Sequence, residues 1–141
     1  MKRLAGSKGF TLIELVLVIT VLGILAVAAL PSFINVSTQA RQASMAGVAG
    51  AVRSGVALFR ANDLVTNGPP GAYPGTLDAA AAASTSGPAN TFFGNILQTG
   101  VSDGAWTKGA DVNTYIFNDG TVAYTYTYVP ATGAFTSPTG P

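Results

Sequence analysis

Few side chains in this sequence can do acid–base, nucleophilic or metal chemistry. The 141 residues include neither cysteine nor histidine. A disulfide, a thiolate metal site, a cysteine nucleophile and a Ser-His-Asp triad are therefore excluded. Charged residues make up 9% of the chain, whereas globular domains usually carry about 25%. No pair of acids, nucleophile–base set or phosphate-binding loop is recognisable, so we expect that the protein is not an enzyme.

Three aspartates are the candidates for binding a cation. Asp103, Asp111 and Asp119 offer the hard oxygen ligands that calcium prefers. Their spacing matches no EF-hand loop, and aspartates near glycine are typical of turns. No cofactor is expected apart from calcium at these three carboxylates.

The charges are distributed unevenly along the chain. Residues 1–60 hold six of the seven basic residues and one acid, Glu14. Residues 61–141 hold five acids and one base, Lys108. A basic patch is the usual mark of nucleic-acid binding, and the net charge of +1 gives no such signal. We therefore expect no nucleic-acid partner.

A long apolar segment begins directly after Glu14. Residues 15–40 carry no charge, and residues 15–30 are almost all aliphatic. As a helix, Phe10–Leu30 is about 32 Å long, enough to cross a hydrocarbon core of about 30 Å. Basic residues precede it, which places its amino-terminal end in the cytoplasm.

Three interpretations of this segment are open. A secretory signal peptide would be cut at the Ala-Val-Ala of residues 26–28, but Glu14 stands at the front of its apolar run. A plain membrane anchor explains the hydropathy but not Glu14, which would cost roughly 2.5–3.5 kcal/mol near the bilayer centre. The third interpretation depends on the residues around this glutamate.

That third interpretation is a resemblance to a known family. Residues 8–15, Lys-Gly-Phe-Thr-Leu-Ile-Glu-Leu, followed by an aliphatic run and Pro31, resemble the amino terminus of type IV prepilins and pseudopilins. The resemblance implies that prepilin peptidase, a membrane aspartyl peptidase, cuts after Gly9 and methylates the new amino group of Phe10. Glu14 stands where the family has its glutamate, and Pro31 where many members have a helix-bending proline.

The carboxylate of Glu14 needs a partner in apolar surroundings. Cleavage after Gly9 creates an ammonium group on Phe10. If subunits stack with an axial stagger, the amine of an incoming subunit meets Glu14 of its neighbour. Desolvation offsets most of this attraction, so we interpret the pair as a device that sets the assembly register.

The helical pattern continues beyond Pro31 and becomes amphipathic. Its apolar residues recur at intervals of three and four in two runs: Phe33, Val36 and Ala40, and then Met45, Val48, Val52, Val56 and Phe59. Pro31 predicts a bend or local melting of residues 27–31. Asn62-Asp63 and then residues 67–70 carry signals for the end of the helix.

The second half of the chain predicts short strands. Residues 114–117 and 121–129, separated by Asn-Asp-Gly, predict a hairpin. Its second strand alternates strictly, which places Tyr124, Tyr126 and Tyr128 on one buried face. Residues 134–136 predict a third strand, and residues 76–83 a short helix.

These patterns together predict an α+β fold, and the resemblance implies that this fold is pilin-like. We divide the chain into a leader (1–9), a hydrophobic transmembrane and assembly helix (10–31), its amphipathic continuation (32–62) and a carboxy-terminal β domain (63–141). The domain is expected to be an antiparallel sheet of three or four strands packed on the helix.

The function expected from the resemblance is that of a structural filament subunit. The expected partners are prepilin peptidase, an inner-membrane assembly platform and further copies of the chain. The precursor would lie in the bacterial inner membrane, and the assembled form would be an extracellular filament for adhesion, motility or surface attachment. Residues 40–59 and 71–74, with Trp106 later in the chain, look most like pilins of the mannose-sensitive haemagglutinin type, and residues 126–135 are similar to the last hairpin of many pilin-like proteins.

Two other functions stay open at this point. A pseudopilin of a type II secretion system shares the same amino terminus, and its family is known for a calcium site near the three aspartates. A membrane-anchored or secreted periplasmic binding or adhesion module is the second alternative. The chain lacks the cysteines with which many type IV pilins close a carboxy-terminal loop.

Overall fold

This computed structural model describes residues 9–136 and 138–139, and the side chains of these residues except 31–35. Its elements are α1 (Leu12–Asn67), β1 (Trp106–Lys108), β2 (Thr114–Asn118), β3 (Ala123–Val129) and β4 (Ala134–Phe135). Residues 1–8 of the predicted leader lie outside the described residues. The chain forms two compact units, Met1–Ser37 and Thr38–Pro141.

In the first unit, α1 begins at Leu12 and continues through Pro31 without interruption. The predicted local melting near Pro31 is therefore not seen. A proline inside a helix removes one backbone hydrogen bond. The alanines and leucine that precede it are good helix formers, so the other backbone hydrogen bonds of the helix are kept.

In the second unit, α1 ends at Asn67, beyond the predicted end at residue 62. The two residues expected to stop the helix instead support it. The Thr66 hydroxyl donates to the Asn62 carbonyl at 2.8 Å, and the Asn67 amide donates to the Asp63 carboxylate at 2.6 Å. Gly68 then ends the helix in the left-handed region, with φ of 83°.

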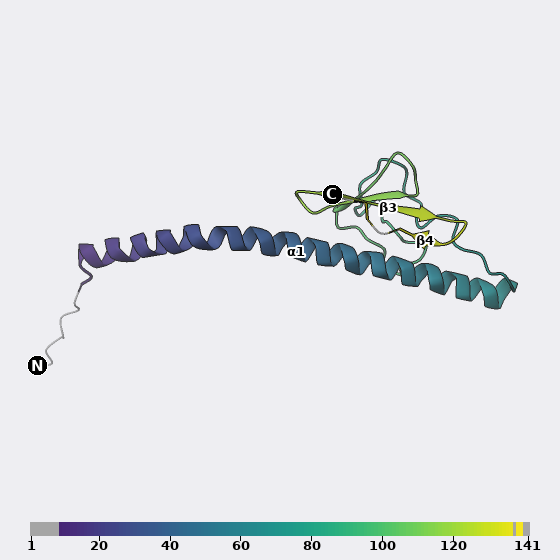
Figure 1. Cartoon of the computed structure of the whole chain (residues 1–141), viewed down its shortest axis with the longest axis horizontal. Helices are drawn as coiled ribbons and strands as arrows, with labels where there is room; N and C mark the ends of the chain where they lie inside the picture. The colour runs from purple at the N-terminus through teal and green to yellow at the C-terminus, as the bar shows by residue number, and fades with distance from the viewer. Residues whose placement is uncertain (1–8, 137, 140–141) are drawn as a thin grey trace, which may run out of the picture. The chain divides into compact units, whose positions relative to one another are not determined.

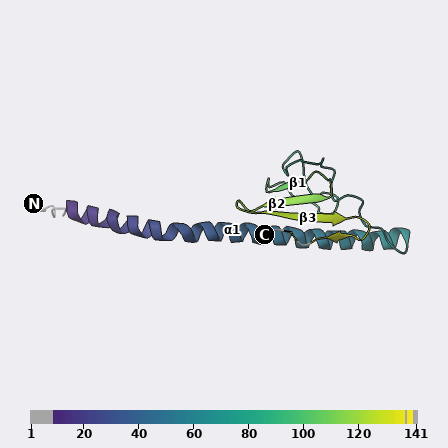
Figure 2. The same cartoon turned by 45° about the horizontal axis from the view of Figure 1, so that its top comes forward.

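A four-stranded antiparallel sheet of order β1-β2-β3-β4 lies beside the carboxy-terminal half of α1 (Figures 1 and 2). The predicted hairpin is confirmed as β2 and β3, in which Tyr115 pairs with Tyr126. The third predicted strand is confirmed as β4. β1 was not predicted, because three residues are too short for a periodic signal.

The predicted short helix over residues 76–83 is wrong. This segment is irregular, and Ala83 has a positive φ of 56°. Leu77 and Asp78 point into the core, where they are 0% and 4% exposed. Burial of these two consecutive side chains anchors the segment to the sheet. The helix propensity of the alanines that follow is too small to outweigh this burial.

Aromatic rings fill the core between the sheet and α1. Tyr126 and Tyr128 are buried and Tyr124 is half-buried, which confirms the predicted face of β3. The predicted stripe on α1 supplies the opposite wall. Met45, Val52 and Val56 of this stripe are less than 8% exposed, whereas Phe59 at its end is 39% exposed. Ala49, which the predicted stripe did not include, is also buried, at 1% exposed.

Candidate functional site

Thr11 and Glu14 together close the first turn of α1. The Thr11 backbone N–H and hydroxyl donate to Glu14 Oε2 at 2.8 and 2.7 Å, and the Glu14 N–H donates to the Thr11 hydroxyl at 3.3 Å. This reciprocal arrangement is a capping box, which satisfies amide groups at the helix start. Threonine three residues before glutamate is its sequence signal.

The geometry leaves half of the Glu14 carboxylate available. Both Thr11 bonds go to Oε2, and no described residue donates a hydrogen bond to Oε1. Gly9 and Phe10 precede the helix and are exposed, Phe10 to 90%. The peptide bond between them is thus outside regular structure, and Oε1 of Glu14 remains available to a positive partner.

No described residue covers the apolar part of α1 that follows. Leu12–Leu30 has a mean hydropathy of 2.8 and is long and apolar enough to cross a membrane. Every large side chain along it is exposed, from 44% for Val16 to 81% for Leu12. Such a continuous apolar surface requires lipid or other chains around it.

Polar side chains of α1 attach the sheet and its loops to the helix. Arg53 donates from Nε to the Phe135 carbonyl at 3.1 Å. The Arg60 guanidinium donates to the Tyr73 hydroxyl and stacks 4.7 Å from the centre of that ring. Tyr73 in turn covers Gly133, where an added Cβ would lie 2.2 Å from the ring.

Gln42 and Asp119 form the corresponding contact at the β2–β3 turn. The Gln42 amide donates to Asp119 Oδ2 at 2.9 Å, and Asp119 Oδ1 accepts from the backbone N–H of Thr121 and Val122. Hydrogen bonding, first from Gln42 and then from the turn, holds the pKa of Asp119 far below its usual value.

The three calcium candidates occupy separate turns. Asp103 accepts from Ala105 N–H at 2.9 Å, and Asp111 accepts from Asn113 N–H at 2.7 Å. Among the described residues, no group of three acidic side chains could hold a metal ion. Calcium binding stays a prediction: a rise in melting temperature with calcium that chelation reverses would support it, and an unchanged melting temperature would refute it.

A buried ion pair joins the irregular segment after α1 to β1. Lys108 Nζ lies 2.7 Å from Asp78 Oδ1, and the two side chains are 0% and 1% exposed. Nζ also donates to the Val112 carbonyl at 2.6 Å. Asp78 Oδ2 accepts from Phe93 N–H at 3.1 Å and from the Tyr115 hydroxyl at 2.9 Å.

Sequence reasoning missed this pair. A lone lysine in a stretch that is otherwise acidic and apolar was the available signal, because an isolated charge in a small β domain requires either solvent or a partner. Nothing in the sequence showed that its partner would be Asp78, thirty positions earlier.

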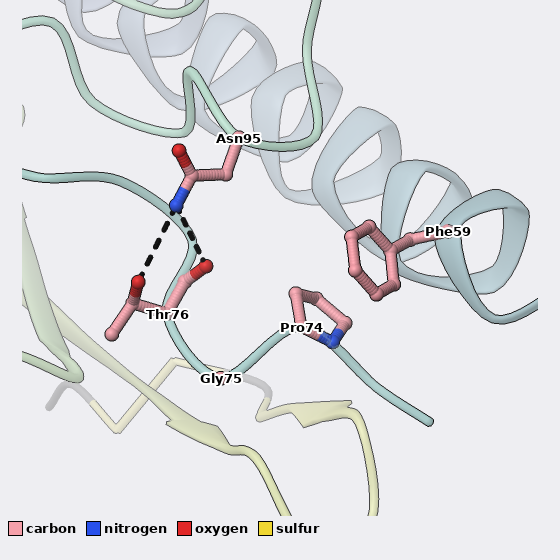
Figure 3. A pocket seen from close by; sticks show the side chains of 5 residues that line it. All are labelled: Phe59, Pro74, Gly75, Thr76 and Asn95. Carbon is pink, nitrogen blue, oxygen red and sulfur yellow. Dashed lines mark hydrogen bonds between the residues drawn. The ribbon is translucent and has the colours of Figure 1, made fainter. Parts of the chain in front are cut away.

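A shallow hollow lies where α1 meets the loops of the same unit. It is lined by Phe59, Pro74, Gly75, Thr76 and Asn95. Figure 3 shows the Phe59 and Pro74 rings side by side, while the Asn95 amide donates to the Thr76 carbonyl at 3.0 Å and the Thr76 hydroxyl at 3.3 Å. Its lining carries no charge and no catalytic combination of residues.

Comparison with known proteins concerns the amino-terminal segment that contains Gly9, Phe10 and Glu14. A family model described as the prokaryotic N-terminal methylation motif matches residues 4–30. No curated protein and no solved structure matched the chain.

The chain thus carries the signature of type IV prepilins and pseudopilins. This motif supports processing by prepilin peptidase and assembly into pilus-type filaments. Together with the apolar helix, it fits a membrane-anchored precursor.

Proposed function

We propose that this chain is the structural subunit of a type IV pilus-like filament. In this proposal it is cut after Gly9, methylated on Phe10 and polymerised through its amino-terminal helix. The observation that carries the proposal is the exposed apolar segment Leu12–Leu30, which lies within the methylation motif of residues 4–30 and contains a single acidic residue, Glu14. The role is structural and requires no enzymatic turnover.

Polymerisation gives the apolar segment a second environment equivalent to lipid. A helix that leaves the bilayer must cover its apolar surface again, and a bundle of identical helices does this without exposing it to water. Contacts between different surfaces of identical subunits propagate into a helical filament when the rotation from one subunit to the next does not close a ring.

The part of α1 in the second unit also supports close approach of a neighbour. One exposed face consists of small side chains: Ala43, Gly47, Gly50, Ser54 and Ala57. A Cβ added at Gly47 or Gly50 would meet nothing within 4 Å. An uncharged surface of this kind accommodates another helix at short distance.

Glu14 is proposed to set the register of assembly. Its Oε2 is committed to the helix cap, and its Oε1 is available to the ammonium group that cleavage creates on Phe10. Pro31 is proposed to adapt the helix to its neighbours in the filament. Neither residue is needed for insertion or cleavage.

The experiment compares Glu14→Gln with Glu14→Ala. Glutamine preserves the capping box but has no charge, whereas alanine removes both. If the charge sets the register, both variants will be inserted and cut normally but will give few filaments, because an unpaired buried ammonium costs about 3–5 kcal/mol. Filament yield is measured by electron microscopy of sheared surface material, and normal yield from Glu14→Gln would refute the role of the charge.

The same microscopy separates the remaining alternatives. Surface filaments that contain this chain would support a pilus subunit, and filaments confined to the periplasm would support a pseudopilin of a secretion system. A chain that stays anchored and never polymerises would support the periplasmic binding or adhesion module. The likeness to pilins of the mannose-sensitive haemagglutinin type stays a prediction.

A further inference from the structure

The proposed filament role makes no use of the buried Asp78–Lys108 pair. An amine and a carboxylate lie in hydrogen-bond contact, 2.7 Å apart, with both side chains sealed from solvent. We propose that Lys108 and Asp78 condense into an intramolecular amide bond, which makes this pair a self-modification site. The inference does not depend on the filament role.

The condensation balances without any added reactant. A proton passes from the Lys108 ammonium to the Asp78 carboxylate along their hydrogen bond, leaving a neutral amine and a neutral acid. The amine nitrogen then attacks Cγ of Asp78 and forms the new C–N bond. One C–O bond breaks, and its oxygen leaves as water with the transferred proton and a second proton from the nitrogen. Nothing is oxidised or reduced.

The surroundings of the pair favour this reaction over a permanent ion pair. Fixed contact between the two groups replaces a bimolecular encounter. Two charges without water are costly to bury, and the neutral amide removes that cost while its N–H can still donate to the Val112 carbonyl, which already accepts from Nζ at 2.6 Å. The centres of the Phe92 and Tyr115 rings lie 5.8 and 4.7 Å from Nζ, and these rings help to exclude solvent.

Two donors are already aimed at the oxygen on which charge would develop. The Tyr115 hydroxyl and the Phe93 N–H donate to Asp78 Oδ2 at 2.9 and 3.1 Å. Fixed donors of this kind stabilise a tetrahedral intermediate. Burial, together with the charge of Asp78, raises the pKa of Tyr115 far above its usual value, so its hydroxyl keeps its proton and can donate. Tyr115 is therefore the catalytic residue of the condensation.

The link would close residues 78–108 into a covalent loop. It would join the irregular segment after α1 to β1 in a chain that has no cysteine and so no disulfide. Cross-linking positions that are distant in sequence stabilises a fold by restricting its unfolded state.

Trypsin provides a direct test, because Lys108 is the only lysine or arginine after Arg60. The full-length chain is purified in detergent, denatured and digested, and its fragments are weighed by mass spectrometry. A linked Lys108 resists cleavage, so we expect one fragment, 61–141, that is lighter than its sequence by one water. Two fragments, 61–108 and 109–141, or an uncut fragment of full sequence mass, would overturn the proposal.

Two variants complete the test. Lys108→Arg keeps the positive charge and the trypsin site but has no primary amine, so it should give two fragments. Tyr115→Phe keeps the ring and removes the hydroxyl, so the linked fraction should form more slowly after synthesis. Formation of the link at the wild-type rate would overturn the catalytic role of Tyr115.

Discussion

Two carboxylates in this protein, those of Glu14 and Asp119, are held in place by the hydrogen bonds that they accept. Glu14 receives two bonds from Thr11 on one oxygen. Asp119 receives bonds from its own turn and from Gln42, seventy-seven positions away in the sequence. In both cases the donors bind the ionised carboxylate. The hydrogen bonds favour the charged form, and the charge in turn strengthens the hydrogen bonds that hold the local structure.

The stabilising effect of Asp119 should depend on pH. Its folded-state pKa lies below the ordinary value because of its hydrogen bonds, so its contribution is complete above the ordinary pKa of about 3.9 and is lost as the pH falls below that value. Melting temperatures of the detergent-solubilised chain at pH 7 and pH 3 measure this effect. Asp119→Asn, which keeps an acceptor oxygen, should lose less stability on acidification than the wild type; an equal loss would contradict the assignment.

At the scale of elements, α1 changes its surroundings along its length. In the first unit its large apolar side chains over Leu12–Leu30 are exposed, whereas in the second unit a stripe of apolar side chains forms one wall of the aromatic core. The arginines beside that stripe bind carbonyl groups of β4 and of the loop after the helix. Burial on one side and polar contacts along its edges hold the sheet on the helix.

Two valines of α1 provide a matched test of this arrangement. Val52 is fully buried against the sheet, and Val65 is 88% exposed. Val52→Ala should lower the free energy of unfolding by about 1.5–3 kcal/mol, whereas Val65→Ala should change it by less than about 0.5 kcal/mol. Urea unfolding followed by tryptophan fluorescence reports on both, since Trp106 lies in the core. Similar losses for the two variants would contradict the packing of the stripe.

At the scale of the whole molecule, one chain must satisfy two environments. Residues 10–141 carry six acids and four bases, and the three basic residues of the leader, Lys2, Arg3 and Lys8, would be removed by the cut after Gly9. Before assembly the apolar helix matches a bilayer in length. After assembly, as proposed, the same surface is covered by other copies of the chain.

The mass of the mature chain tests the proposed processing. A cut by prepilin peptidase gives a chain that begins at N-methylated Phe10, because the motif places the cleavage after Gly9. A Gly9→Val variant serves as the control and should keep its leader. A mature chain that begins at Ala29 would instead establish cleavage as an ordinary signal peptide.

The sequence by itself determined the features that depend on neighbouring residues. The apolar run, the methylation motif, the β2–β3 hairpin and the buried tyrosine face of β3 follow from composition or from short periodic patterns. The capping box belongs to the same class, because Thr11 and Glu14 are three positions apart. These features need no knowledge of the rest of the chain.

Only the tertiary structure decided what depends on distant partners. It placed β1 beside β2, turned the predicted helix of residues 76–83 into an anchored irregular segment and joined Lys108 to Asp78. It also separated the three aspartates that the sequence suggested as one calcium site. Burial of a polar group depends on partners brought close by folding, and a local sequence pattern carries no information about which partner that will be.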